Sequence, residues 1–96
     1  MYKECLDHEL TLNHIAFARE CSVPLKYRGR ALRSTLRLDF LVEGRLILET
    51  KAIDALAQIH AAQLLTYLRL SNVRIGLLMN FNVITLNKGI RRIING

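Results

Sequence analysis

The feature that most restricts the fold is a β-hairpin pattern in the middle of the chain. Apolar residues alternate with other residues over positions 35–42, and a second apolar segment begins at position 46, after Glu43-Gly44-Arg45. Alternation with a period of two is typical of a strand with one buried face. Two such strands separated by a short turn that contains glycine form a hairpin, so residues 35–51 are predicted to fold back on themselves.

The register of this hairpin follows from the need to keep its apolar residues on one face. A two-residue loop would place Val42 opposite Arg45 and misalign the apolar residues of the two strands. A three-residue loop, residues 43–45, places Val42 opposite Leu46 and keeps them aligned, so we expect this loop. It pairs Phe40 with Leu48 and Leu38 with Thr50 on the apolar face, and Asp39 with Glu49 and Arg37 with Lys51 on the other.

The remaining segments are predicted to supply helices and strands around the hairpin. Before the hairpin we expect a helix at 2–13 and short strands at 15–19 and 23–27. After it we expect a helix that is capped by Asp54 and runs to about Leu70, and then a strand at 73–81. A final unit at 83–86 and 89–94 is either helix or strand. A length of 96 residues indicates a single domain, 1–96. We expect an α/β fold with a mixed sheet of about four strands flanked by helices, in the order α-β-β-β-α-β.

Basic residues outnumber acidic residues and are unevenly distributed. Fourteen Lys and Arg stand against eight Asp and Glu, and all eight acidic residues lie between Glu4 and Asp54. Such an excess is typical either of a solvated surface or of a protein whose partner is a polyanion such as nucleic acid. A cluster beside the predicted turn at Arg28-Gly29 has the same two interpretations, a solvated loop or contacts to backbone phosphates. Its members are Arg28, Arg30 and Arg33.

The composition argues against membrane and disulfide-rich classes. The longest stretch without a charged residue, 55–68, is shorter than the roughly 18–20 apolar residues of a membrane span. Two cysteines, Cys5 and Cys21, do not make a disulfide framework, and no signal peptide is visible after Met1. We therefore expect a cytoplasmic protein with no membrane partner.

The predicted register places two carboxylates, Asp39 and Glu49, opposite each other. Like charges in this arrangement destabilise a sheet, so the pair needs an explanation. One explanation is a surface ladder of charges in which Arg37 and Lys51 neutralise the acids. Another is a divalent cation such as Mg²⁺, which prefers one or two carboxylates together with phosphate oxygens and water. Lys51 would then lie where it can orient a water molecule or stabilise charge on a phosphate.

An Asp followed by Glu-x-Lys on a β-hairpin resembles the signature of the PD-(D/E)XK nuclease superfamily. The matching residues are Asp39 and the tripeptide Glu49-Thr50-Lys51, and apolar residues precede Glu49 as in a central strand. The resemblance implies a restriction-endonuclease-like core. It also implies that Asp39, Glu49 and the backbone carbonyl of Thr50 bind Mg²⁺ or Mn²⁺, and that Asp39, Glu49 and Lys51 are the catalytic residues.

Further candidates lie on the helix that follows and on the first strand of the hairpin. Gln63 and Tyr67 are spaced four residues apart and so share one helix face, a pair that resembles the RecB-like branch of the superfamily. They are expected either to contact nucleic acid and support the site or to form a polar edge of the core. His60 either reaches phosphate or is an ordinary surface histidine. Arg37 either binds phosphate or neutralises the acids.

A closer resemblance is to a group of small bacterial proteins, the GxxExxY family, which is assigned to the same superfamily. It rests on four segments, residues 37–43, 49–52, 60–69 and 76–81. The Gly and Glu of the family motif would precede Met1, so only its Tyr is matched, by Tyr2. The missing Glu resembles an acidic residue that supports the metal in related nucleases. We therefore expect a truncated chain with weakened metal binding.

Three functions remain open at this point. The resemblance implies an Mg²⁺-dependent nuclease that hydrolyses phosphodiester bonds in DNA. The missing Glu favours a catalytically weak or inactive nucleic-acid-binding or assembly module on the same fold. The hydrophobic content of 51% favours a structural fragment or a subunit of a homo-oligomer with no nucleic-acid role. The three hypotheses differ in whether the protein cuts DNA, binds DNA without cutting it, or does not bind DNA.

Overall fold

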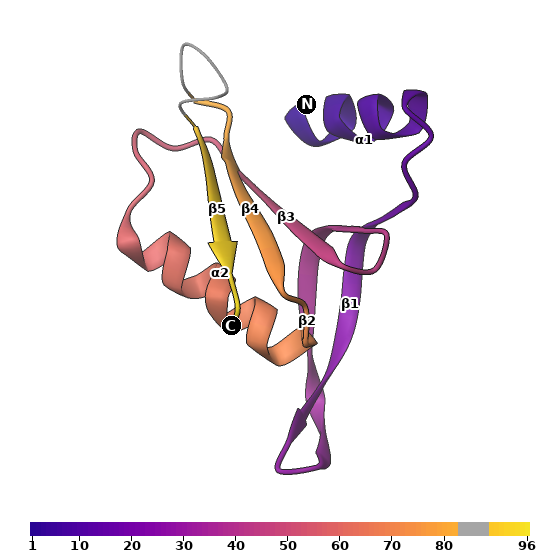
Figure 1. The fold of residues 1–96 in the computed structure, drawn as a ribbon, viewed down its shortest axis with the longest axis vertical. Helices are drawn as coiled ribbons and strands as arrows, with labels where there is room; N and C mark the ends of the chain where they lie inside the picture. The colour runs from indigo at the N-terminus through magenta and orange to yellow at the C-terminus, as the bar shows by residue number, and fades with distance from the viewer. Residues whose placement is uncertain (83–88) are drawn as a thin grey trace.

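The computed structural model describes residues 1–82 and 89–96. The chain forms a mixed sheet with two helices, which confirms the α/β class (Figure 1). In chain order the elements are α1 (Tyr2–Leu12), β1 (Phe17–Tyr27), β2 (Arg30–Val42), β3 (Leu46–Lys51), α2 (Gln58–Ser71), β4 (Ile75–Asn80) and β5 (Ile90–Ile94). The last part of the predicted final unit is therefore a strand, β5, whereas positions 83–86 lie outside the described residues.

The five strands lie in the sheet in chain order, β1-β2-β3-β4-β5. All neighbouring pairs are antiparallel except β3 and β4, which are parallel. A parallel pair needs a crossover connection, and α2 provides it (Figure 1). The two short strands predicted at 15–19 and 23–27 are one strand, β1. Pro24 lies within it because β1 is an edge strand, where a missing N–H does not break a ladder on both sides.

The turn between β2 and β3 has the predicted three-residue loop. Val42 pairs with Leu46, and Phe40 pairs with Leu48. Within the loop Glu43 and Gly44 have φ angles of 51° and 69°, in the left-handed region that such loops require. The N–H of Arg45 donates to the carbonyl of Val42 at 3.0 Å. The apolar pattern thus predicted the register at the turn end of this hairpin.

The predicted single apolar face of β2 is wrong beyond Asp39. Phe40 and Val42 pack in a cluster with α1, whereas Leu36 and Leu38 pack in a cluster with α2. Residues of the same parity therefore face opposite sides of the sheet. The change occurs opposite Glu20 of β1, whose φ of 52° is left-handed and interrupts the alternation of the strand pair. The pairing of β2 with β3 ends at the same point, with Phe40 and Leu48.

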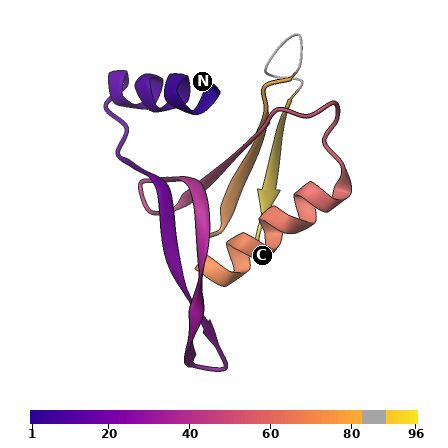
Figure 2. The same ribbon diagram turned by 180° about the vertical axis from the view of Figure 1, so that it is seen from behind.

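The two helices cover opposite faces of the sheet (Figure 2). Ile47 and Leu48 are neighbours in β3 and point to opposite faces, so Ile47 joins the α2 cluster and Leu48 the α1 cluster. The helix at 2–13 is confirmed as α1. Among the described residues, neither helix has the length and apolar character of a membrane-spanning segment.

The second helix begins later than predicted. Its N-cap is Ala57, not Asp54. The Nδ1 atom of His60 accepts a hydrogen bond from the N–H of Ala57 at 2.9 Å, so a histidine three residues into the helix does part of the capping. Asp54 instead accepts a 3.5 Å contact from the side chain of Asn82. The segment between Lys51 and α2 is therefore an irregular connection beside the end of β3.

Candidate functional site

Asp39 and Glu49 lie where the ladder between β2 and β3 ends, and their side chains replace its backbone hydrogen bonds. The N–H of Asp39 donates to Oε1 of Glu49 at 3.1 Å. The N–H and the hydroxyl of Thr50 both donate to Oδ2 of Asp39 at 2.9 Å. Each carboxylate is thus held by the opposite strand. The expected backbone pairs beyond Phe40 and Leu48 are not part of the β2–β3 register; they are Asp39 with Glu49, Leu38 with Thr50 and Arg37 with Lys51.

The two carboxyl groups differ in their tendency to ionise. Glu49 is 7% exposed, and burial raises its pKa to about 7, a shift to which the nearby charge of Asp39 also contributes. Burial also raises the pKa of Asp39, but the hydrogen bonds from Thr50 and Lys3 outweigh it and hold that pKa below its usual value. Asp39 is therefore ionised at neutral pH, while Glu49 is balanced between its two forms.

Sequence reasoning missed a lysine that faces this carboxylate pair. Nζ of Lys3, in the first turn of α1, lies 3.0 Å from Oδ1 of Asp39 and 3.1 Å from Oε1 of Glu20. The hydrogen bond to Asp39 is the main reason that the pKa of Lys3 is raised. No local pattern points to this contact, because it joins residues 36 positions apart.

The arginine predicted beside Asp39 pairs elsewhere. The Nε atom of Arg37 lies 3.3 Å from Oε2 of Glu20, and the side chain is 71% exposed. Glu20 thus forms ion pairs with both Lys3 and Arg37, and its pKa is lowered, chiefly by the hydrogen bond from Lys3. Glu20 is the acidic residue that the structure brings nearest to Asp39 from β1, a position that no sequence motif indicated.

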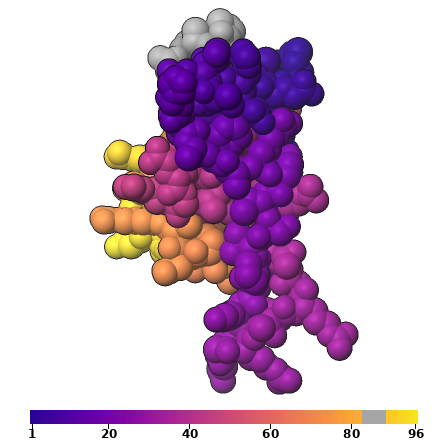
Figure 3. Space-filling model, turned by 90° about the vertical axis from the view of Figure 1, so that its right-hand side faces the viewer, coloured from indigo at the N-terminus to yellow at the C-terminus, as the bar shows by residue number. Residues whose placement is uncertain are grey.

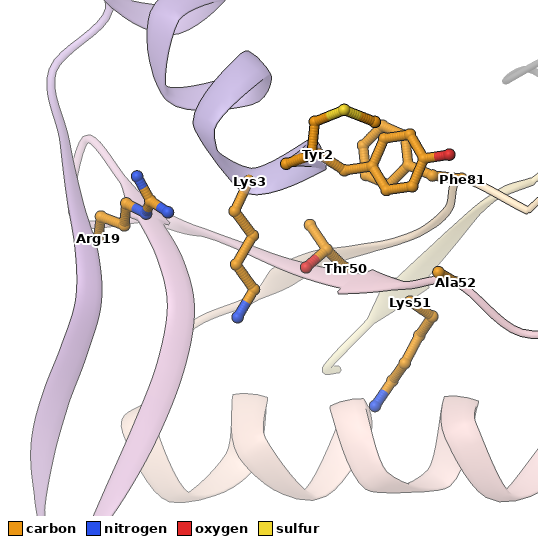
Figure 4. A pocket seen from close by; sticks show the side chains of 8 residues that line it. Tyr2, Lys3, Arg19, Thr50, Lys51, Ala52 and Phe81 are labelled. Atoms are coloured by element: carbon orange, nitrogen blue, oxygen red, sulfur yellow. The ribbon is translucent and has the colours of Figure 1, made fainter.

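Lys51 ends β3 and extends toward α2 (Figure 4). It lines two surface pockets. One is also lined by Tyr2, Lys3, Arg19, Thr50, Ala52 and Phe81, and the other by Ile59, His60, Ala62, Gln63 and Thr66 of α2. Within the described part of the chain its ammonium group has no carboxylate partner. Lys51 is therefore a cation that remains available to a ligand between the two pockets.

Of the predicted residues on α2, two lie beside Lys51 and one lies farther into the core. His60 and Gln63 line the same pocket as Lys51. The hydroxyl of Tyr67 accepts a hydrogen bond from Nε2 of Gln63 at 3.0 Å, and its ring packs against the α2 cluster. Gln63 thus links the pocket to Tyr67, whereas one nitrogen of His60 is occupied by the start of the helix.

Asn80 holds the chain directly after the site and was not assigned a role from the sequence. It is 2% exposed at the end of β4. Its Oδ1 accepts from the N–H of Ile53 at 3.1 Å, and its Nδ2 donates to the carbonyl of Ile53 at 3.0 Å. The N–H of Phe81 donates to the carbonyl of Lys51 at 2.9 Å. The signal in the sequence was an amide at the end of an apolar strand, followed two residues later by a second amide, Asn82.

The donor chemistry at the ladder end fits a hard divalent cation. Asp39 and Glu49 offer carboxylate oxygens, and no group of three or more His, Cys, Asp or Glu that could hold a metal occurs within residues 1–82 and 89–96. Mg²⁺ is commonly held by one or two carboxylates, with water and phosphate completing its shell, whereas a structural zinc site uses four protein ligands. The raised pKa of Glu49 is a cost that a bound cation would relieve.

The sequence was compared with models of known protein families, and one of them matches. Residues 1–93 match the family model described as PD-(D/E)XK nuclease superfamily. No curated protein and no solved structure matches the chain. The matched region includes both helices and β1 to β4, and therefore every residue of the site described above. The chain belongs to the PD-(D/E)XK nuclease superfamily.

Proposed function

We propose that the protein is an Mg²⁺- or Mn²⁺-dependent nuclease that hydrolyses phosphodiester bonds in DNA, with Asp39, Glu49 and Lys51 as its catalytic residues. The observation that carries the proposal is the arrangement at the end of the β2–β3 ladder. Two carboxylates are held there by hydrogen bonds from the opposite strand, and Lys51, which has no carboxylate partner among the described residues, follows two residues after Glu49. Nucleases of this superfamily usually use divalent metals.

In this proposal Asp39, Glu49 and the backbone carbonyl of Thr50 hold the metal. A divalent ion in such a site lowers the pKa of its bound water and neutralises charge on the phosphate. Thr50 keeps the carboxylate of Asp39 oriented through two hydrogen bonds, so the ligand is positioned before the substrate arrives. The N–H of Asp39 does the same for Glu49.

Lys51 is assigned the role of holding the attacking water or the charge on the phosphate. Its ammonium group lies beside a pocket that also contains Gln63 and His60. These two residues are proposed to contact the nucleic acid, and Tyr67 to position Gln63 through the hydrogen bond at 3.0 Å. Arg37 is exposed at the edge of the site and is proposed to contact a neighbouring phosphate.

Within the superfamily we propose the GxxExxY family. The support is the match of residues 37–43, 49–52, 60–69 and 76–81 to its pattern. The structure describes these segments in full. They contain the parts of β2 and β3 that carry Asp39 and Glu49, most of α2, and most of β4.

Cleavage of supercoiled and single-stranded DNA with Mg²⁺ or Mn²⁺ tests the proposal. Wild type is compared with Glu49→Gln, Lys51→Ala and a matched control, Glu43→Gln, which removes an exposed carboxylate from the turn of the same hairpin. We expect both site variants to lose at least about 100-fold in rate and the control to cleave like wild type. Equal rates in Lys51→Ala and wild type would contradict the assignment. A wild type that binds DNA without cutting it would replace the nuclease with a binding module.

A further inference from the structure

The distal part of the β1–β2 hairpin projects from the sheet as a two-stranded ribbon (Figure 1). We call residues 22–36 the hairpin arm. β3 pairs with β2 at Phe40, Leu41 and Val42, so among residues 1–82 and 89–96 no third strand flanks the arm on that side. β1 is the edge of the sheet, so none flanks it on the other. Every residue from 26 to 35 is exposed, whereas Val23, Leu25 and Leu36 at the base of the arm pack against the α2 cluster. The space-filling view shows the arm projecting from the body of the molecule (Figure 3).

The hairpin arm is strongly basic and carries no acidic residue of its own. Four exposed cations lie on it, and residues 22–36 contain no Asp or Glu. They are Lys26, Arg28, Arg30 and Arg33. Elsewhere in the β1–β2 hairpin, Arg19 and Arg37 each pair with a carboxylate, whereas none of the four arm cations does so within the described residues. A ribbon with this charge repels itself unless an anionic partner is bound.

The tip adds an exposed aromatic ring to this charge. Tyr27 is 62% exposed, and the guanidinium of Arg28 lies 5.5 Å from the centre of its ring. Arginine beside an exposed aromatic is a combination suited to phosphate and to the faces of bases. An apolar partner would leave the four arm cations desolvated and unpaired, so the chemistry of the tip favours a polyanion.

The shape of the arm and its connection to the site favour duplex DNA among polyanions. The major groove of B-form DNA is wide enough to admit a two-stranded β-ribbon. β2 carries both the tip residue Arg30 and the site residue Asp39, nine residues apart. At about 3.3 Å per residue this span is roughly 30 Å, or about nine base pairs of duplex at 3.4 Å each. One duplex can therefore reach the arm and the site together.

We propose that the hairpin arm binds double-stranded DNA, through its phosphates and major groove, about nine base pairs from the bond that is cut. The proposal rests on the nuclease function and assigns the element that holds the substrate. The arm takes no part in the chemistry, so its effect is on binding and on the preferred length of the substrate.

Binding is measured in EDTA, so that it does not depend on cleavage. Fluorescence anisotropy with a labelled 30-base-pair duplex compares wild type with a variant in which Lys26, Arg28, Arg30 and Arg33 are all changed to Gln. The matched control changes four exposed arginines away from the arm to Gln. These are Arg69, Arg74, Arg91 and Arg92. Thermal unfolding checks that both variants fold, which their exposed positions favour.

We expect the plot of log affinity against log salt to become shallower by about 3 to 4 in the arm variant, because each lost phosphate contact contributes roughly 0.9. In the control variant this slope is expected to become shallower by less than 1. Wild type is also expected to bind the 30-base-pair duplex at least about tenfold more tightly than an 8-base-pair duplex, and the arm variant to lose this difference. Equal salt slopes in the arm variant and the control would overturn the proposal, whatever the outcome of the cleavage assay. So would wild type that shows no preference for the longer duplex.

Discussion

Replacing Glu49 with Gln should stabilise the metal-free protein above neutral pH and leave it unchanged near pH 4. The folded protein raises the pKa of Glu49 from 4.5 to about 7, so the folded state holds this proton more tightly than the unfolded chain does. The free energy of unfolding is therefore highest below pH 4.5 and falls as the pH rises through 7. Gln keeps an oxygen that accepts the Asp39 N–H but has no proton to lose.

The expected size of the effect follows from the pKa change. One pKa unit corresponds to about 1.4 kcal/mol, so the change from 4.5 to about 7 makes wild type about 3 kcal/mol less stable at pH 8 than at pH 4.5. The lowered pKa of Asp39 affects stability in a different pH range, because the stability that it contributes is lost only as the pH falls below 3.8. The raised pKa of Lys3 likewise acts only above 10.5.

Urea unfolding in EDTA at pH 4.5, 6, 7 and 8 gives the free energy of unfolding of wild type and of Glu49→Gln at each pH. The urea midpoints are converted to free energies with one shared value for the dependence of free energy on urea concentration. We expect Glu49→Gln to exceed wild type by about 3 kcal/mol at pH 8 and to match it at pH 4.5. The control Glu43→Gln should follow the pH dependence of wild type. Parallel curves for Glu49→Gln and wild type would refute the argument that burial of this carboxyl destabilises the metal-free fold.

Three further changes test the surroundings of the site. Asn80→Ala leaves the partly buried N–H and carbonyl of Ile53 without the amide that pairs with both, so we expect a loss of about 1–3 kcal/mol in urea unfolding, against little change for exposed Asn82→Ala. Gly76→Ala places a Cβ 2.9 Å from Cδ2 of Leu64 and should cost about 1–3 kcal/mol, a cost that shrinks when Leu64 is also changed to Ala. Lys3→Met removes the ammonium beside the carboxylates and should tighten Mn²⁺ binding about fivefold in calorimetry.

Each of these expectations has a clear contrary result. Full stability in Asn80→Ala would show that water replaces the amide. Additive effects of the Gly76 and Leu64 changes would show that the two residues do not press on each other. Unchanged or weaker Mn²⁺ binding in Lys3→Met would show that the lysine does not compete with a metal for the carboxylates.

The sequence predicted those parts of the fold that local patterns determine. The register at Val42 and Leu46 followed from the alternation over positions 35–42 and a turn that contains glycine. The break at Asp39 did not, because it depends on a left-handed residue in the neighbouring strand, Glu20. A Glu in that conformation carries no signature of its own, since glycine and asparagine are the residues that usually indicate it.

The start of α2 and the contacts of Lys3 likewise could not be predicted from local sequence patterns. Asp54 is a favourable capping residue, yet the chain continues to Ala57 before it becomes helical, because Asn80 holds the preceding segment through Ile53. Lys3 reaches Asp39 only because α1 folds back over the sheet. Contacts between distant segments decided both cases, whereas the carboxylates and Lys51 were found from their spacing within one hairpin.

Isothermal titration calorimetry of Mn²⁺ into the metal-free protein shows whether Asp39 and Glu49 form a metal centre. We expect wild type and Glu43→Gln to bind alike, and Asp39→Asn and Glu49→Gln each to bind at least about tenfold more weakly, since each removes one of two carboxylate ligands. Equal Mn²⁺ affinity in all four proteins would contradict the assignment of Asp39 and Glu49 as a metal centre.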